Sequence, residues 1–228
     1  MNGAIAAIVP IRSLAGGKTR LAGVLTPSQR ETLTRSMVQR VIAAALSSDA
    51  IASVIVVSED PAALALARAV DPRVIGLAQD GSGHPGLLGA LDQARAYADV
   101  RAVSGLLVLF GDLPLLDGDD VRHLVRRDAP VVVAPDRHGA GTNALLLRHT
   151  AADPGPNAFR FQFGEGSYAR HVAEAHRLGF DVATSISAGT SFDLDTPDDL
   201  DLLREEPRVA AAMGPHAVAA VMVGRRAR

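Results

Sequence analysis

Short aliphatic runs alternate with alanine-rich segments along most of the chain. The runs are almost continuously apolar, as expected of strands that helices cover on both faces of a sheet. They occupy residues 5–11, 53–58, 74–77, 106–110 and 131–134, with a further strand around 182–186. The pattern therefore predicts an α/β fold with a mixed, mostly parallel sheet.

The segments between the runs carry signals for the start of helices. Thr26 is followed by Pro27, and Gln29 stands three positions after the threonine, which is the pattern of a capping box with proline in the first turn. Apolar residues then recur at helical spacing through Leu46 and form the buried stripe of this helix. Further helices are predicted at 60–70, from Asp117 or Asp119 through 127, at 167–178 and after Thr196.

The chain shows no internal repeat and no low-complexity linker. Glycine and proline become frequent after about residue 136, and they predict loops at 139–142 and 154–166. We expect one domain over residues 1–206 and a helical or flexible tail at 207–228. The tail ends in only three basic residues, so packing on the domain or on a second subunit of a homodimer is favoured over membrane-surface binding.

The composition is that of an ordinary globular protein. Of 228 residues, 48% are hydrophobic and 21% are charged, and 23 Lys and Arg against 25 Asp and Glu give a formal net charge of −2. This balance excludes the basic surface of a nucleic-acid-binding protein. The absence of cysteine excludes disulfides, thiolate nucleophiles and cysteine-ligated zinc. No basic region precedes the first apolar run and no run approaches the ~18 residues of a membrane span, so we expect a cytoplasmic protein without a signal peptide.

Ligands of open α/β sheets bind beyond the carboxyl ends of the strands, so the loops that follow the predicted strands are the candidate sites. The first of these loops contains Gly16, Gly17, Lys18 and Arg20. Its glycines can expose backbone N–H groups, and its cations can pair with phosphates. The same residues are also compatible with a plain solvated loop.

The Gly-Lys-Thr triplet at 17–19 raises the alternative of a P-loop ATPase or kinase. A P-loop requires glycine at the position of Arg12 and a helix that continues from the Lys-Thr pair. Gly23 and Pro27 interrupt any such helix soon after its start. The spacing therefore argues against a P-loop, and no G-x-G-x-x-G dinucleotide fingerprint occurs in this turn.

Three acidic residues lie close after predicted strands or in extended segments. Asp112 follows the strand at 106–110, and Asp193 and Asp195 alternate, so that both point to one side of an extended chain. Two carboxylates on one side repel each other unless a cation lies between them. Carboxylate oxygens suit Mg²⁺ better than zinc, so the three acids predict a magnesium site. Each acid is also compatible with a turn or cap, although Thr196 is better placed than Asp195 to cap the last helix.

The chain resembles one family of enzymes in five segments. It is similar to the guanylyltransferases that start the side chain of the deazaflavin coenzyme F-420 in the segments LAGGKTRL, FGDLP, GTNALLL, FGEGSYARH and DLDTPDDL. The resemblance covers residues 4–205. Many nucleotidyltransferases share the GDLP segment, whereas the combination of GTNALLL with FGEGSYARH is specific for this family.

The resemblance implies a single Rossmann-like nucleotidyltransferase domain of the glycosyltransferase-A type. Members of the family transfer GMP from GTP to the phosphate of a three-carbon phospho-acid and release pyrophosphate. The implied substrates are GTP and either phosphoenolpyruvate or 2-phospho-L-lactate, and the implied metal is Mg²⁺. Phosphoenolpyruvate is favoured because the alanine- and arginine-rich composition is typical of a GC-rich bacterium.

The resemblance also implies functional residues at the positions that match the family's motifs. The metal-binding acids match Asp112, Asp193 and Asp195. The acceptor-binding positions match Thr142, Gly164 and Ser167. The nucleotide-binding loop matches Gly16, Gly17, Lys18 and Arg20. The implied catalytic residues are Lys18, Arg20 and Asp112.

One departure from the family pattern concerns the nucleotide. The family is expected to carry Leu-Asn before the third crossover helix, whereas this chain has Leu88 in place of the asparagine, and leucine cannot form an amide's hydrogen bonds. A cytidylyltransferase or sugar-phosphate nucleotidyltransferase therefore stays open as an alternative, as does a non-catalytic nucleotide-binding domain. Ser167 and Gly164 likewise have a purely structural alternative, as a helix cap and a turn of the chain.

Overall fold

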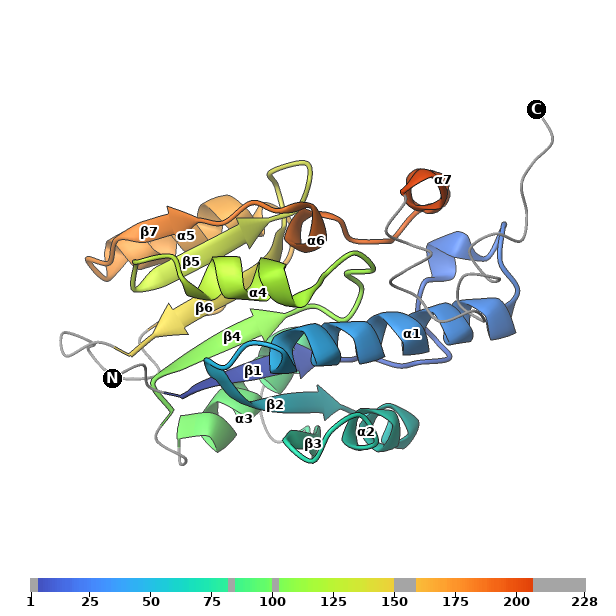
Figure 1. Ribbon diagram of the computed structural model, residues 1–228, viewed down its shortest axis with the longest axis horizontal. Helices are drawn as coiled ribbons and strands as arrows, with labels where there is room; N and C mark the ends of the chain where they lie inside the picture. The colour runs from blue at the N-terminus through green and yellow to red at the C-terminus, as the bar shows by residue number, and fades with distance from the viewer. Residues whose placement is uncertain (1–3, 82–84, 100–102, 150–158, 207–228) are drawn as a thin grey trace.

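The computed structural model describes residues 4–81, 85–99, 103–149 and 159–206 (Figure 1). The predicted tail at 207–228 lies outside the described residues, as does the part of the predicted 154–166 loop that precedes residue 159. None of the described helices is long and apolar enough to cross a bilayer.

The described residues form one seven-stranded sheet with the order β3-β2-β1-β4-β6-β5-β7. The strands are β1 (Ile5–Pro10), β2 (Ile51–Ser58), β3 (Val74–Ala78), β4 (Gly105–Leu109), β5 (Val131–Pro135), β6 (Thr142–Arg148) and β7 (Val182–Thr184). All pairings are parallel except those of β6 with β4 and with β5. The prediction of a mixed, mostly parallel sheet is confirmed, and β6 is a strand additional to the predicted ones.

The reversed direction of β6 decides where its first residues lie. Leu109 at the carboxyl end of β4 pairs with Ala144, and Pro135 at the carboxyl end of β5 pairs with Thr142. The amino end of β6 therefore lies at the same edge of the sheet as the carboxyl ends of its neighbours. This edge is where open α/β sheets bind ligands.

Helices cover both faces of the sheet (Figure 1). The elements are α1 (Pro27–Leu46), α2 (Pro61–Arg68), α3 (Leu87–Asp99), α4 (Gly118–Val125), α5 (Ser167–Arg177), α6 (Ala188–Ser191) and α7 (Pro197–Glu205). Apolar residues of α1, α2 and α4 join the core on one face, and those of α3 and α5 join the core on the other. The two-faced burial explains why the strands read as continuous apolar runs.

The predicted helix caps are present at the start of four helices. The side chain of Thr26 accepts a hydrogen bond from the N–H of Gln29, and Oε1 of Gln29 accepts one from the N–H of Thr26. Thr196 starts α7 with a capping box as well. Asp60 and Asp117 cap α2 and α4. These caps satisfy backbone N–H groups that have no partner inside the helix.

The loop after β1 does not continue into an α-helix. A short 3₁₀ turn, η1 (Thr19–Leu21), follows Lys18, and α1 begins only at Pro27. A P-loop needs a long helix directly after its Lys-Thr pair, with free N–H groups at its start. The P-loop alternative is therefore wrong for this chain.

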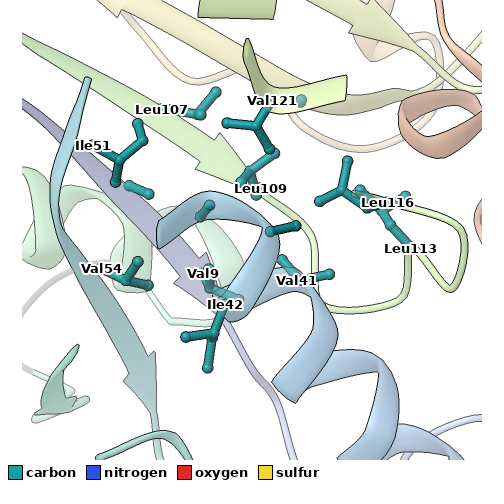
Figure 2. Close-up of a cluster of buried hydrophobic side chains, with 14 of the residues drawn as sticks. Val9, Val41, Ile42, Ile51, Val54, Leu107, Leu109, Leu113, Leu116 and Val121 are labelled. Carbon is teal, nitrogen blue, oxygen red and sulfur yellow. The ribbon is translucent and has the colours of Figure 1, made fainter. Parts of the chain in front are cut away.

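Strand residues alternate between the two cores. In β1, Ala7 and Val9 pack toward α1 and α4, whereas Ala6 and Ile8 pack toward α3. Figure 2 shows the first core, in which side chains from β1, β2 and β4 meet those of α1 and α4. Strand side chains point to opposite faces in turn, so a one-residue shift of register would exchange the two cores.

A smaller apolar cluster holds the site loops on α1. Leu21 of η1 and Leu194, which lies before α7, are both fully buried against Leu33 and Met37. A fully buried leucine contributes about 1.5–3 kcal/mol. The cluster therefore brings the loop after β1 and the segment before α7 to the same end of α1.

Candidate active site

Lys18 lies between two carboxylates that come from distant parts of the chain. Its Nζ is 2.8 Å from Oδ2 of Asp112 and 2.7 Å from Oδ1 of Asp195, and its side chain is only 9% exposed. Burial acts to lower the pKa of Lys18, but the charges and hydrogen bonds of Asp112 and Asp195 outweigh it, and the pKa is raised. Lys18 is therefore a cation at neutral pH, fixed at the carboxyl end of β4.

The backbone of Lys18 is strained in order to reach this position. Its φ of 54° is left-handed, and it is the one non-glycine residue in the described part of the chain with a positive φ. This conformation costs an L-residue about 1–2 kcal/mol. Burial of Leu21 three residues later, together with two ion pairs, offsets the strain. Strain of this kind is concentrated at functional sites.

The third predicted acid, Asp193, lies in the same cluster. Burial raises the pKa of Asp193, and the charges of Asp112 and Asp195 raise it further. Its Oδ1 accepts a hydrogen bond from Nδ2 of Asn143 at 3.2 Å. The structure thus brings the three predicted acids together, but in the described residues no three acidic or histidine side chains surround one point as metal ligands would.

The other residues of the predicted nucleotide loop differ in how they face the site. Arg20 is 73% exposed, and its Nη1 lies 3.8 Å from Oδ2 of Asp195. Gly17 lines the cleft described below, and a Cβ built there would lie 3.3 Å from the carbonyl oxygen of Ser13. The N–H of Gly16 donates to Oγ of Ser13 at 3.1 Å, so this amide already has a partner.

A cleft of about 610 Å³ opens beside Lys18. Its walls come from the loops after β1, β2, β3 and β4, from α1, from the start of α3 and from the segment before α7. They include Lys18, Glu59, Gln79, Leu87, Phe110, Asp112 and Asp195. Leu88, where the family is expected to carry asparagine, is 38% exposed, whereas its neighbour Leu87 lines the cleft. The volume suits a ligand of nucleotide size.

The three predicted acceptor-binding residues are brought together by contacts between β6 and α5. Oγ1 of Thr142 lies 3.0 Å from Nδ1 of His171, and the N–H of Tyr168 donates to the carbonyl oxygen of Ala140 at 3.1 Å. Ser167 is the first residue of α5, and its N–H donates to the carbonyl oxygen of Gly164. The start of β6 and the start of α5 therefore form one surface.

Ser167 does not cap α5. The N-cap is Gly166, with a φ of 65° and no side-chain hydrogen bond to the helix. The cap alternative for Ser167 is therefore wrong, and its buried hydroxyl is not used by the helix start. Gly164 does turn the chain. Its φ of 118° is a backbone conformation that glycine adopts at turns and that would strain any residue with a Cβ.

Hydrogen bonds hold the acidic segments together and join them to the start of β6. The N–H of Leu194 donates to the carbonyl oxygen of Asp112 at 3.1 Å, and the N–H of Phe110 donates to that of Asn143 at 3.3 Å. Asn143 also holds Asp193 and directly follows Thr142 in the chain. The acids consequently lie between the basic loop and the predicted acceptor residues.

Two aspartates have positioning roles that the sequence pattern only half indicates. Asp60 is a predicted helix cap, but its Oδ2 also accepts the N–H of Leu14 at 2.9 Å and so ties down the loop after β1. Asp199 accepts the N–H groups of Asp195 at 2.8 Å and Thr196 at 2.7 Å, and it pairs with Arg137. The cap motifs were the signals that could have indicated both residues.

Asn143 and His171 are functional candidates for which the sequence carries no separate signal beyond the family motifs. His171 is fully buried, and its Nε2 accepts the N–H of Gln162 at 2.9 Å. Both residues act through partners on other elements. Such partners are visible only in the folded chain.

The fold is that of the nucleotidyltransferase class. A strained basic loop, an acidic cluster and a cleft of nucleotide size lie together at the carboxyl edge of its mixed α/β sheet. Solved structures agree: a Desulfovibrio desulfuricans G20 protein, provisionally named a nucleotide-diphospho-sugar transferase, matches with a TM-score of 0.72 at 17% identity, covering 95% of this chain and 93% of that one. The 4-diphosphocytidyl-2C-methyl-D-erythritol synthase structure matches with a TM-score of 0.57 at 12% identity, over 89% of this chain and 98% of that one. These likenesses show the fold.

Residues 5–204 match the family described as "Guanylyl transferase CofC like", and the chain belongs to this family. The phosphoenolpyruvate guanylyltransferase of Rubrobacter xylanophilus is 41% identical over 85% of this chain and 90% of that protein. The 2-phospho-L-lactate guanylyltransferase of Methanothermobacter thermautotrophicus is 32% identical over 85% of this chain and 81% of that protein. The family indicated by the sequence motifs is thereby confirmed.

Proposed function

We propose that this protein transfers GMP from GTP to the phosphate of a three-carbon phospho-acid and releases pyrophosphate, as a step of coenzyme F-420 biosynthesis. The observation that carries the proposal is the meeting of Lys18, Asp112 and Asp195 beside the 610 Å³ cleft. Membership of the guanylyltransferase family supports GTP as the donor. Phosphoenolpyruvate is the favoured acceptor, because relatives with that name are more similar to this chain than the relative named for 2-phospho-L-lactate.

The reaction needs positioning and charge neutralisation more than proton transfer. An oxygen of the acceptor phosphate attacks the α-phosphorus in line, and the bond from that phosphorus to the pyrophosphate oxygen breaks. Both reactants are anions, so the protein must hold them together against their repulsion. The attacking phosphate is already ionised near neutral pH, so no general base is required.

Lys18 and Arg20 are the residues proposed to hold the triphosphate. Lys18 keeps its proton because its pKa is raised, so its ammonium can neutralise charge that develops on the departing pyrophosphate. Arg20 is exposed and only loosely paired with Asp195, so its guanidinium is available to phosphate oxygens. Thr142, Gly164 and Ser167 are proposed to hold the phospho-acid on the other side of the acids.

The charge of the acidic cluster fits a divalent cation. Two of the three carboxylates, those of Asp112 and Asp195, pair with the ammonium of Lys18, and their charges add to the effect of burial in raising the pKa of Asp193. Hard oxygen donors are the ligands that Mg²⁺ prefers. Asp112, Asp193 and Asp195 do not surround one point in this structure, so their side chains would have to rearrange to hold Mg²⁺, which supplies neutralisation of phosphate charge when it is bound.

The test is pyrophosphate release from GTP with phosphoenolpyruvate, 2-phospho-L-lactate and 3-phosphoglycerate in turn. We expect turnover with GTP and phosphoenolpyruvate, and much less with CTP, UTP or ATP. Turnover with CTP in place of GTP would favour the cytidylyltransferase alternative. Nucleotide binding without pyrophosphate release under any combination would favour a non-catalytic binding domain.

A further inference from the structure

A single imidazole connects the two segments of the proposed acceptor site. His171 on α5 is fully buried, with its ring edge-on to Phe163 at a centroid distance of 4.6 Å. Nε2 lies 2.9 Å from the backbone N of Gln162, and Nδ1 lies 3.0 Å from Oγ1 of Thr142. Thr142 begins β6, and Gln162 precedes Gly164 in the loop before α5. The ring thus touches both sides of the site.

The hydrogen bonds of His171 determine which nitrogen carries its proton. A backbone N–H can only donate, so Nε2 must be the unprotonated nitrogen that accepts from Gln162. The proton of the neutral ring is therefore on Nδ1, and this N–H donates to Oγ1 of Thr142. Burial, assisted by the charge of Arg170, lowers the pKa of His171 to about 4, so the ring stays neutral near neutral pH.

This assignment leaves the Thr142 hydroxyl with one role. Its oxygen accepts from His171, so its own hydrogen must be donated to another acceptor. Among the described residues no other hydrogen bond of this hydroxyl is present, although the residue is only 4% exposed. A buried donor without a partner is unfavourable, so the hydroxyl is prepared for an acceptor atom supplied by a ligand.

We propose that His171 is a positioning residue of the acceptor site, which fixes the Thr142 hydroxyl as a donor toward an anionic oxygen of the phospho-acid. Through Nε2 the same ring holds the loop that carries Gly164. The proposal rests on the proposed function, which places the phospho-acid at Thr142. A carboxylate or phosphate oxygen only accepts hydrogen bonds and fits this donor, whereas a carboxamide N–H at the same position does not.

A matched pair of substitutions separates the two hydrogen bonds of the ring. His171→Asn places an amide N–H near the position of Nδ1, so it retains the donor to Thr142 and loses the acceptor for Gln162. His171→Gln reaches the position of Nε2, so it retains an acceptor for Gln162 and loses the donor to Thr142. Thr142→Val removes the hydroxyl itself, and Thr142→Ser is its conservative control.

The measurement is KM for phosphoenolpyruvate and for GTP, with kcat, in each variant. We expect His171→Gln and Thr142→Val each to raise KM for phosphoenolpyruvate about tenfold or more, while KM for GTP stays within about twofold. Thr142→Ser should stay within about threefold of the original enzyme, and His171→Asn, which loses only the bond to Gln162, should raise KM for phosphoenolpyruvate clearly less than His171→Gln does. The double variant Thr142→Val with His171→Gln should be no worse than Thr142→Val alone, because both remove the same interaction.

A spectroscopic readout checks the ring independently of turnover. A long-range ¹H–¹⁵N spectrum, with the His171 signals assigned by their loss in His171→Asn, should show the Nδ1–H tautomer unchanged between pH 5 and 8. An Nε2–H tautomer, or titration of this ring within that range, would overturn the proposal.

The outcomes also separate this proposal from the proposed function. Turnover of the original enzyme with a normal KM for phosphoenolpyruvate in His171→Gln would overturn the role of His171 and leave the function standing. If the original enzyme releases no pyrophosphate, calorimetric binding of phosphoenolpyruvate provides the second arm. Binding that is weakened more by His171→Gln than by His171→Asn would support the role of His171 without the function, and absence of binding would overturn both.

Discussion

The two halves of the candidate site are built from different interactions. The nucleotide half contains charged groups, with the side chains of Asp112 and Asp195 30% and 44% exposed around Lys18. The acceptor half contains neutral, buried groups, with Thr142 4% exposed and His171 fully buried. Ion pairs at a partly exposed site can exchange partners with an incoming anion, whereas directional hydrogen bonds in a buried site hold one geometry. The first half is therefore suited to neutralising charge, and the second to selecting shape.

The largest effect is expected in the nucleotide half. Lys18→Met should lower kcat/KM for GTP by about 10³, or about 4 kcal/mol, because both the pyrophosphate and the two carboxylates lose their cation. KM for phosphoenolpyruvate should change little. Arg20→Met is the control, and it should cost only about tenfold because this side chain is exposed and loosely paired. Titration that shows equal loss of affinity for both substrates in Lys18→Met would mean that the loop has only a structural role.

The acidic cluster provides a second strong test of the charged half. Asp112→Asn should depress turnover by about 10² to 10³, since it removes one proposed metal ligand and one partner of Lys18. Activity should be lost in excess chelator and return with Mg²⁺ or Mn²⁺. Full turnover in the presence of chelator would rule out the metal site.

In the acceptor half, burial of His171 should make the stability of the protein depend on pH. The folded pKa of His171 is about 4 against an ordinary value of 6.5, so between these values the unfolded chain binds a proton that the folded chain does not. The contribution of His171 to the free energy of unfolding is therefore complete above pH 6.5. It is lost as the pH falls to 4, by about 3 kcal/mol in total.

Urea unfolding of the original protein and of His171→Asn at pH 7 and pH 4.5 measures this difference. Other titrating groups contribute equally to both proteins, so the loss on acidification should be smaller in the variant. Parallel losses in the two proteins would show that His171 titrates normally and is not held neutral by burial.

The smallest expected effect distinguishes a ligand-binding serine from a helix cap. Ser167→Ala should raise KM for phosphoenolpyruvate roughly fivefold to tenfold and change the free energy of unfolding by less than about 0.5 kcal/mol, because Gly166 is the N-cap of α5. Thr26→Ala is the matched control, since Thr26 is a true cap and its loss should cost about 1 kcal/mol of stability without changing KM. A stability loss in Ser167→Ala with a normal KM would place the acceptor elsewhere.

Every strand except β6, the starts of α1, α2, α4, α5 and α7, and the family could be predicted from the sequence because their signals are local. The capping box at Thr26 and the caps at Asp60 and Thr196 each depend on a few adjacent residues, and all are present. The candidate loops followed from the rule that ligands bind at the carboxyl edge of a parallel sheet. The rule predicts that Lys18 and Asp112 lie at the same edge of the sheet, but it does not predict the ion pair between them.

Only the tertiary structure decided how these residues pair and which way β6 runs. Lys18 lies 94 positions from Asp112 and 177 from Asp195, and its left-handed backbone is unusual for a lysine. An apolar run carries no information on strand direction, so the sequence did not indicate that the reversed β6 would bring Thr142 to the site edge. The same holds for His171, because a histidine acquires its tautomer and its pKa from partners that only packing places beside it.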